Sequence, residues 1–226
     1  MPAAIDQLIR SKRRTIAIIV QRDGKVIVRA PLKVPEALIR AFIESKSGWI
    51  AEKKAEAAQH VRLPVKQFRG GEKFLLLGRE IPLRVVPGQK TALSLQEDFI
   101  LNQTAQPKAR AVFEKWYQAK AREVLTERVQ LYARQFGLRY TKIRISSAWT
   151  RWGSCSSRGT LSFTWRLVMA PLDVVDYVVI HELAHLKVKN HAPFFWAEVA
   201  KMQPDYKRRL TWLKKNGRFL TLEGAE

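Results

Sequence analysis

The segment HELAHLKVKNH restricts the fold more than any other part of the chain, because it holds three of the four histidines. His181 and His185 are four residues apart, so a helix would project both imidazole rings from one face, a turn apart. That spacing lets two ring nitrogens share one Zn²⁺ ion at about 2.0–2.1 Å each. The pattern therefore predicts a helix that carries part of a metal site.

A third ligand is expected just beyond this helix. His191 follows the second histidine closely, and Asn190 can adopt the left-handed conformation that ends a helix and turns the chain back toward the metal. Glu198, on the next predicted helix, is the alternative third ligand. Three protein ligands plus a water molecule is the arrangement of catalytic zinc sites, whereas structural sites use four protein ligands.

Glu182 lies between the first two histidines and can reach a water molecule at the open coordination position. Its expected role is that of general base and then proton shuttle, while zinc polarises the scissile group and lowers the pKa of the water. The sequence thus predicts one Zn²⁺ ion per chain, with His181, His185 and His191 as ligands and Glu182 as the catalytic base.

Residues 150–171 form a predicted hairpin that leads into the metal-binding helix. Apolar and polar side chains alternate along 161–167, so one face of this strand is apolar. Trp152 and Trp165 are expected to pack in the core. An edge strand beside a metal cleft can hold an extended peptide through backbone pairing.

Polar side chains near this site are candidates for binding substrate. Arg151 and Arg166 could bind an anionic substrate group or the developing oxyanion, with surface salt bridges as the alternative role. Tyr206 is a third substrate-binding candidate. Other residues that could stabilise an oxyanion are Tyr177, Arg208 and Arg209.

Composition narrows the class of protein. Of the 226 residues, 46% are hydrophobic and 27% charged, which is typical of a globular chain with a buried core. No apolar run approaches the ~20 residues of a membrane-spanning helix, and the N-terminus lacks the apolar region of a signal peptide. The single cysteine, Cys155, excludes an internal disulfide and fits a reducing compartment. We therefore expect a cytoplasmic protein with no membrane partner.

The chain is predicted to fold into two α+β parts. Residues 1–105 should form a basic N-terminal part and residues 106–226 the metal-binding part, in which the H-E-x-x-H helix packs on a small antiparallel sheet. A hairpin is expected over 15–29, turning at Asp23-Gly24. The remaining predicted elements are a helix over about 34–60, an antiparallel sheet of short strands between 74 and 101, a linker at 103–107, helices at 108–136, 170–189, 193–202 and 205–215, and paired strands at 143–149 and 161–168.

The chain carries a formal charge of +21, with 41 Lys and Arg against 20 Asp and Glu. Residues 1–150 hold 29 basic and 13 acidic residues, and residues 151–226 hold 12 and 7. Such a charge attracts polyanions, although a role in solubility alone is the alternative. A nucleic acid or another polyanion is therefore a candidate partner for the basic N-terminal part. The sequence does not indicate an oligomeric state.

Several segments resemble the YgjP-like metal-dependent hydrolases, namely TRWGSCSS, LSFTWRLVMAP, DYVVIHELAHL, NHAPFFW and PDYKRRLTWLKKNG. The resemblance is dense over residues 140–217 and looser before them. It implies a zincin-like catalytic core with His181, His185 and His191 on the metal and Glu182 as base. More distantly, the chain resembles the SprT and Wss1 type of metalloprotease, which acts on proteins bound to DNA.

Three functions are compatible with these features. A zinc-dependent metallopeptidase is favoured by the motif and the adjoining strand, and it would take a peptide or protein as substrate. A zinc-dependent hydrolase of nucleotide phosphoanhydrides is the alternative, but the site lacks the carboxylates that would hold a second metal ion. The third is a nucleic-acid-associated protein with a secondary metal site, which leaves the position of Glu182 unexplained.

Overall fold

The computed structural model describes residues 5–21, 24–58 and 65–222. The chain divides into two compact units, with the boundary at Val65 and the second unit spanning Lys66–Leu222. Within the described ranges, no helix is both long and apolar enough to cross a bilayer. The mixture of helices and three small sheets confirms the predicted α+β class.

The first unit is a three-stranded sheet with two helices. Its elements are β1 (Gln7–Ser11), β2 (Ala17–Val20), β3 (Val26–Pro31), α1 (Glu36–Ser45) and α2 (Ser47–Ala58). The predicted hairpin is confirmed, since β2 pairs antiparallel with β3, and β1 adds to the other edge of β3 in parallel. The predicted helix over 34–60, in which Gly48 is the expected point of interruption, is present as two helices, and the break lies at Lys46, where the backbone leaves the helical conformation.

The second unit begins with a four-stranded sheet in the order β4-β5-β7-β6. Its strands are β4 (Lys73–Leu76), β5 (Arg79–Val86), β6 (Leu93–Leu95) and β7 (Phe99–Asn102). The strands are those expected, but the sheet is mixed rather than antiparallel because β5 and β7 run parallel. The predicted linker is instead the 3₁₀ helix η1 (Gln103–Lys108), capped by the side chain of Asn102.

This sheet belongs to the unit that carries the histidines, so the compact units divide near residue 65 and not near 105. The β4–β5 turn donates two backbone hydrogen bonds, from Leu77 to the Val168 carbonyl at 2.7 Å and from Gly78 to the Met169 carbonyl at 3.2 Å. The hydroxyl of Tyr117 donates to the Leu75 carbonyl at 2.6 Å. These bonds join segments far apart in sequence, which local composition does not reveal.

The compact units also divide the positive charge differently from the count made on the two sides of residue 150. Residues 66–222 contain 28 Lys and Arg against 12 Asp and Glu, whereas residues 1–65 contain 13 against 6. The larger share of the excess charge therefore belongs to the same unit as the histidines.

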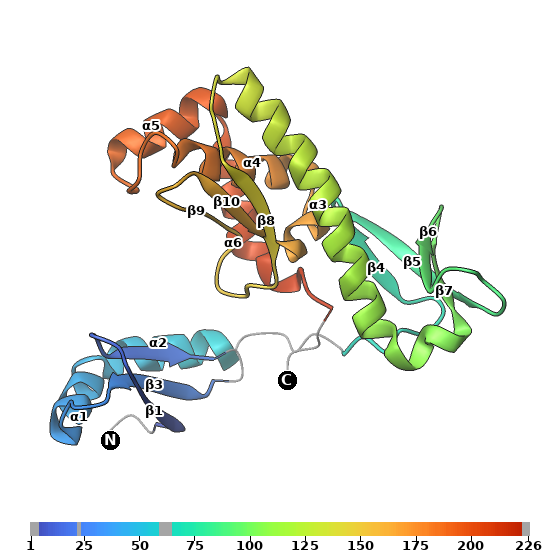
Figure 1. Cartoon of the computed structure of the whole chain (residues 1–226). Helices are drawn as coiled ribbons and strands as arrows, with labels where there is room; N and C mark the ends of the chain where they lie inside the picture. The colour runs from blue at the N-terminus through green and yellow to red at the C-terminus, as the bar shows by residue number, and fades with distance from the viewer. Residues whose placement is uncertain (1–4, 22–23, 59–64, 223–226) are drawn as a thin grey trace. The chain divides into compact units, whose positions relative to one another are not determined.

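A long helix, α3 (Ala109–Gln135), joins the two parts of the second unit (Figure 1). One end packs against the β4–β7 sheet through a cluster of rings that includes Phe74, Phe99 and Phe113. The other half packs against the remaining sheet and helices. The helix stops at the predicted place because Gly137 adopts a φ of 62°, which glycine tolerates without strain.

The second sheet has the order β8-β10-β9, with β8 (Lys142–Ser146), β9 (Gly153–Cys155) and β10 (Thr160–Thr164). The predicted pairing of 143–149 with 161–168 exists, but it is parallel, and the hairpin partner of β10 is β9. The expected strand also ends earlier, since residues 165–169 form the 3₁₀ helix η2 (Trp165–Met169). This sheet is therefore mixed and β9 is an outer strand, while β10 lies in the middle.

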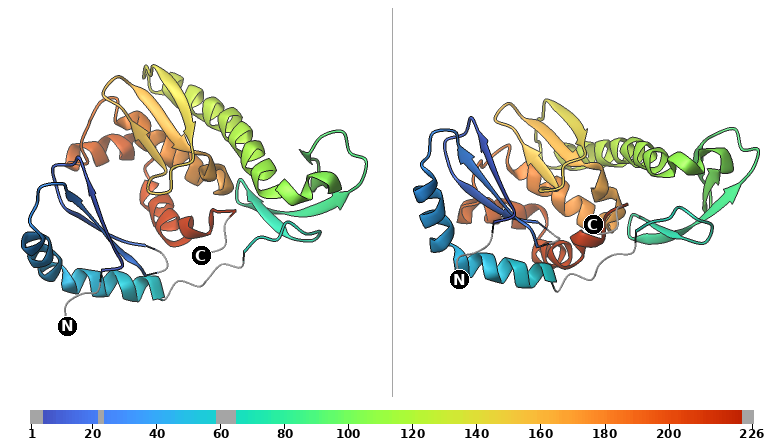
Figure 2. Two further views of the ribbon diagram at one scale, coloured as in Figure 1. Left: turned by 60° about the horizontal axis from the view of Figure 1, so that its bottom comes forward. Right: turned by 90° about the horizontal axis from the view of Figure 1, so that it is seen from below.

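Three helices follow, α4 (Leu172–Ala184), α5 (Pro193–Met202) and α6 (Tyr206–Asn216), ending in the short η3 (Gly217–Phe219). Figures 1 and 2 show these helices on one side of the β8-β10-β9 sheet. The α4 sequence LDVVDYVVIHELA is apolar on all sides, and most of its residues are buried. A helix of this kind needs neighbours all round, and α3, α5, α6 and β9 supply them.

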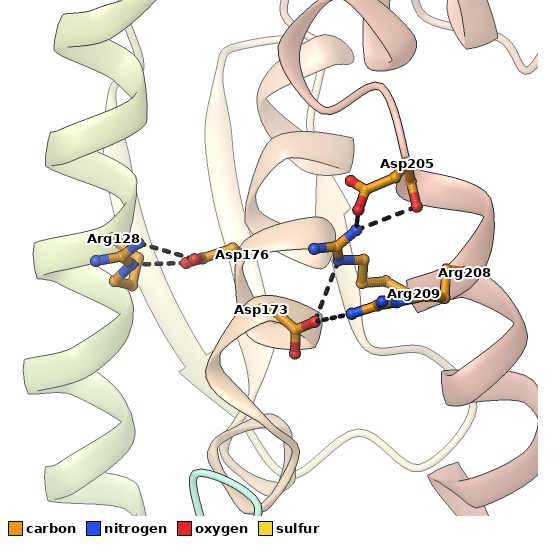
Figure 3. Close-up of polar contacts among 6 residues, drawn as sticks. All are labelled: Arg128, Asp173, Asp176, Asp205, Arg208 and Arg209. Carbon is orange, nitrogen blue, oxygen red and sulfur yellow. Dashed lines mark hydrogen bonds and ion pairs between the residues drawn. The ribbon is translucent and has the colours of Figure 1, made fainter.

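Ion pairs fix α4 between α3 and α6 (Figure 3). Arg128 of α3 binds the buried Asp176 of α4 through two nitrogens, at 2.6 and 2.8 Å. This pair raises the pKa of Arg128, chiefly through its hydrogen bonds to Asp176. On the opposite side, Arg209 of α6 contacts Asp173 at 3.2 Å and also Asp205. The helix that carries the first histidine is thus held from two sides.

Candidate metal centre

The structure brings the three predicted histidines together. His181 lies in the last turn of α4, His185 caps that helix, and His191 lies in the loop before α5. The Nε2 atoms of His181 and His191 are 3.0 Å apart, and those of His185 and His191 are 3.2 Å apart. Nitrogen atoms of all three rings lie within 4.8 Å of one another.

The route from the helix to His191 differs from the expected one. The helix ends at Ala184 and not near residue 189, and Asn190 is not among the residues with positive φ. The chain turns directly after the helix, with the amides of Lys187 and Val188 donating to the Ala184 carbonyl. The helix end is therefore set by this tight turn, which also returns His191 to the cluster.

The cluster has the properties of a metal site. Three Nε2 lone pairs that face one another repel unless a cation lies between them, and a tetrahedral ion with bonds of about 2.05 Å separates its nitrogens by about 3.3 Å. The Nδ1 atom of His185 lies 2.9 Å from the Val188 carbonyl, to which it can donate its proton. The lone pair of Nε2 is then available to bind a metal. Burial and the two neighbouring histidines lower the pKa of His181 to about 3, so its ring is neutral, as a ligand must be.

A buried phenylalanine supports the three rings. Phe195 of α5 is fully buried and contacts all of them, stacking on His185 with a ring-centre distance of 4.4 Å. The ring centre of Trp196 lies 5.8 Å from those of His181 and His191. The sequence reasoning did not single out either residue. The signal was present in the aromatic run FFW that follows His191, because large rings close to ligands restrict the rotamers of the ligands.

Glu198, the alternative third ligand, is occupied elsewhere. It is buried, and its carboxylate binds Lys201 at 2.6 Å and Lys187 at 3.3 Å. Hydrogen bonds from these two ammonium groups lower the pKa of Glu198. The cluster of potential metal-ligand atoms, for which carboxylate oxygens also count, contains His191 and not Glu198. The geometry therefore favours His191 as third ligand.

Glu182 is buried beside the histidines, on the side that faces β9. Burial raises the pKa of Glu182 to about 8, and the positive charge of Arg151 opposes this shift. Its Oε2 atom is buried without a hydrogen-bond partner among the described residues. Burial of an unpaired carboxyl oxygen is costly, and such positions are concentrated at functional sites.

Gly153 of β9 is a further site residue that sequence reasoning missed. A Cβ atom at this position would lie 2.6 Å from both Cγ and Oε1 of Glu182. No real Cβ has contacts that short, so the strand can approach the carboxylate only with glycine here. The sequence carries a Gly inside the segment RWGSC, and a glycine within a strand is a known sign of a close approach.

We predict that Gly153→Ala displaces the Glu182 side chain. The free energy of unfolding should fall by about 1–3 kcal/mol, as expected for overpacking, and any hydrolytic activity should fall at least about tenfold while the metal content stays unchanged. Denaturant titration, metal analysis and steady-state kinetics measure these effects. Gly70→Ala is the matched control, because a Cβ there meets no atom within 4 Å. Equal behaviour of the two variants would contradict the close contact.

The three substrate-binding candidates lie in different surroundings. Arg151 is exposed, and its charge acts on Glu182. Arg166 is buried, with its guanidinium over the rings of Trp149 and Trp165 at 3.4 and 4.3 Å, and its Nη1 donates to the Ser147 carbonyl. These contacts place the Arg166 side chain in the core against two tryptophan rings. It is therefore not the exposed cation that a surface salt bridge would need, and none of these contacts is a contact with substrate.

Tyr206 lies in an aromatic stack next to the cluster. Its ring stacks on Trp196 at 5.5 Å and on Tyr177 at 6.4 Å. Tyr177 in turn meets the ring of His181 edge-on at 5.9 Å. Burial, followed by the nearby Tyr206 and Glu182, raises the pKa of Tyr177 to about 12, so its hydroxyl keeps its proton. Of the two tryptophans expected in the core, Trp165 is fully buried and Trp152 packs partly buried against the core.

Comparison with known proteins identifies the family of the chain. The model of the YgjP-like metallopeptidase domain matches residues 14–216, which is most of the chain. No curated protein matches. A similar solved structure is the metallopeptidase zymogen abylysin of Pyrococcus abyssi, at 24% identity over 40% of this chain and 93% of that chain, with a TM-score of 0.37. On the family match, the chain belongs to the YgjP-like metallopeptidase family and is a metal-dependent hydrolase.

Proposed function

We propose that the protein is a zinc-dependent peptidase, in which His181, His185 and His191 hold one Zn²⁺ ion and Glu182 is the general base. The observation that carries this proposal is the convergence of three imidazole rings, whose ligand nitrogens lie within 4.8 Å of one another. Glu182, which directly follows the first of these histidines, has a buried Oε2 atom without a partner among the described residues. Three imidazole ligands suit zinc. When bound, zinc would act as a Lewis acid toward the scissile carbonyl and would lower the pKa of a water molecule.

Glu182 would move the proton in this reaction. Its Oε2 atom has no partner among the described residues, so the ionised carboxylate can accept a proton from the attacking water, and this form becomes populated as the pH approaches the raised pKa of about 8. The same carboxyl group can then donate that proton to the nitrogen of the departing amine. Gly153 supports this role because it lets β9 close over the carboxylate and limit the access of bulk water.

The outer strand β9 would position the substrate. The amide of Thr164 donates to the Trp152 carbonyl and the amide of Ser156 to the Thr160 carbonyl. In an antiparallel pair such bonds alternate along the strand, so the main-chain groups of Gly153 and Cys155 point away from β10. An extended peptide could pair with these groups as an added strand. The strand that would pair with the substrate is therefore β9, because β10 is the central strand of the sheet.

Two side chains are candidates for stabilising the oxyanion. Arg151 carries a positive charge that acts on Glu182. The Tyr206 ring stacks on Tyr177, which in turn contacts the ring of His181. Either could donate a hydrogen bond to the negative oxygen that develops during peptide hydrolysis. Arg166 has no such role in this proposal, because its guanidinium is held between two tryptophan rings.

The proposal is tested by loading the protein with Zn²⁺ and measuring both metal content and hydrolysis. We expect about one zinc per chain and cleavage of unfolded proteins and peptides, lost on chelation and restored by Zn²⁺. Nucleoside triphosphates should remain intact. Turnover of triphosphates without peptide cleavage would overturn the proposal, and a chain that takes up no metal would overturn the assignment of the histidines.

A further inference from the structure

A second feature of the same unit is a groove of about 760 Å³ on the β8-β10-β9 sheet. In the β8–β10 register, the core-facing side chains are those of Ile143, Ile145, Leu161 and Phe163. The alternate residues of these strands therefore lie on the opposite face, away from α4, and this face forms the groove. The lining residues are Thr141, Lys142, Arg144, Ser146, Ala148, Arg151, Gly153, Ser154, Cys155, Ser156, Arg158, Thr160, Ser162 and Thr164.

The groove carries only positive charge. Lys142, Arg144, Arg151 and Arg158 line it, and no acidic residue does. All four are exposed, and none forms an ion pair within the part of the chain that the structure describes. Arginine and lysine side chains that gather around hydroxyl groups without acidic neighbours are suited to bind anionic oxygens.

A buried hydroxyl in the groove also has no partner. Thr164 lies on the groove face at the end of β10 and is only 2% exposed. Its Oγ1 atom makes no hydrogen bond to any described residue. Since buried hydroxyls normally have a partner, this oxygen is an independent indication that a polar group from outside completes the groove.

Two residues that line the groove are related to Glu182. Gly153 and Arg151 line the groove, and the first abuts the Glu182 carboxylate while the charge of the second acts on it. A peptide paired with β9 therefore has its flanking residues within reach of the groove. We propose that the groove binds an acidic segment of the protein substrate, a proposal that rests on the peptidase function proposed above.

Two other occupants fit less well. The first unit of this chain is itself positive, with 13 basic against 6 acidic residues in 1–65, so it lacks the complementary charge. A single-stranded nucleic acid would have the right charge, but its binding sites combine cations with aromatic rings on which bases stack. No aromatic residue lines the groove.

Binding is measured with a substrate that cannot be turned over. The zinc-loaded Glu182→Gln variant is titrated, by fluorescence anisotropy, into a labelled peptide rich in glutamate and into the same peptide with glutamine in place of every glutamate. We expect the acidic peptide to bind at least about tenfold more tightly, with an affinity that falls as salt is added. Equal affinity for the two peptides would overturn the proposal, and so would a single-stranded oligonucleotide that binds more tightly and displaces the acidic peptide.

Two substitutions assign the effect to the groove. Arg144→Gln with Arg158→Gln should weaken binding of the acidic peptide about tenfold and leave the neutral peptide unchanged. Arg84→Gln, which removes an exposed cation from β5 in the other sheet, is the control for charge alone. If Arg84→Gln weakens binding as much as the double groove variant, the attraction is nonspecific and the groove assignment fails.

The failure of this proposal can be told apart from failure of the peptidase function. If the wild type cleaves acidic and neutral peptides with equal kcat/KM and binds them equally, the protein is a peptidase and the groove proposal is wrong. If the acidic peptide binds selectively through Arg144 and Arg158 but no peptide is cleaved, the groove proposal stands and the peptidase proposal is wrong.

Discussion

Glu182→Gln is expected to lower kcat/KM for peptide hydrolysis by about a hundred- to ten-thousandfold while the zinc content stays near that of the wild type. Glutamine keeps the shape of the side chain, so the contact with Gly153 and the burial persist. It removes the oxygen that accepts and returns a proton, and general base catalysis contributes a factor of this size. Metal analysis and steady-state kinetics on the same preparations test both halves of the prediction.

The control for Glu182→Gln is Glu127→Gln, the same change at an exposed position of α3. It should leave activity and zinc content at the wild-type level. Retention of full activity in Glu182→Gln would mean that another group is the base. Loss of zinc together with activity would mean that Glu182 supports the metal site and would leave its role as base without support.

The histidine cluster was the part of the structure that the sequence predicted most fully. Spacings of four and six residues identify His181, His185 and His191, because helical geometry and a short return loop are local constraints. Local constraints also predicted α3, α5 and the pairing of β2 with β3, because periodicity and Gly137 act within a few residues. Asp23, in the turn predicted for this hairpin, lies outside the described residues. In these elements the preference of the segment and the packing of the fold agree.

The features that the sequence did not predict depend on contacts between distant segments. The glycine at Gly153 is explained only by the Glu182 carboxylate that lies against it. The β4–β7 sheet joins the histidine-bearing unit through bonds from Leu77 and Gly78 to η2. Arg166 was expected to bind substrate or to form a surface salt bridge, yet its guanidinium lies over the rings of Trp149 and Trp165. Such pairings are set by tertiary packing, which residue spacing does not encode.

The interpretation of charge changes for the same reason. Counting charge on the two sides of residue 150 separated most of the basic residues, 29 of 41, from the histidine cluster. The compact units place 28 basic and 12 acidic residues together with the histidines in 66–222. The field of this unit therefore acts at the site itself, where it can increase the rate of encounter with an anionic substrate.

His191→Ala is expected to lower zinc affinity by more than about a hundredfold, because loss of an outer partner of a ligand already costs about 10- to 100-fold and this change removes a ligand itself. Nε2 of His191 lies 3.0 and 3.2 Å from the Nε2 atoms of the other two histidines. His191 is exposed and in a loop, so the substitution should leave the free energy of unfolding of the metal-free protein nearly unchanged. Competition with a chromogenic chelator measures the affinity.

Glu198→Gln distinguishes the two candidate third ligands. Its carboxylate binds Lys187 and Lys201, so the substitution should leave zinc affinity within a few-fold of the wild type. It should instead lower stability, because it removes the charge of a buried side chain that binds two cations. If Glu198→Gln lost zinc and His191→Ala kept it, the chain would bind metal through two histidines and a carboxylate. The ion pairs of Glu198 would then have to break when the metal binds, and since that would cost free energy, the histidine cluster is the better site.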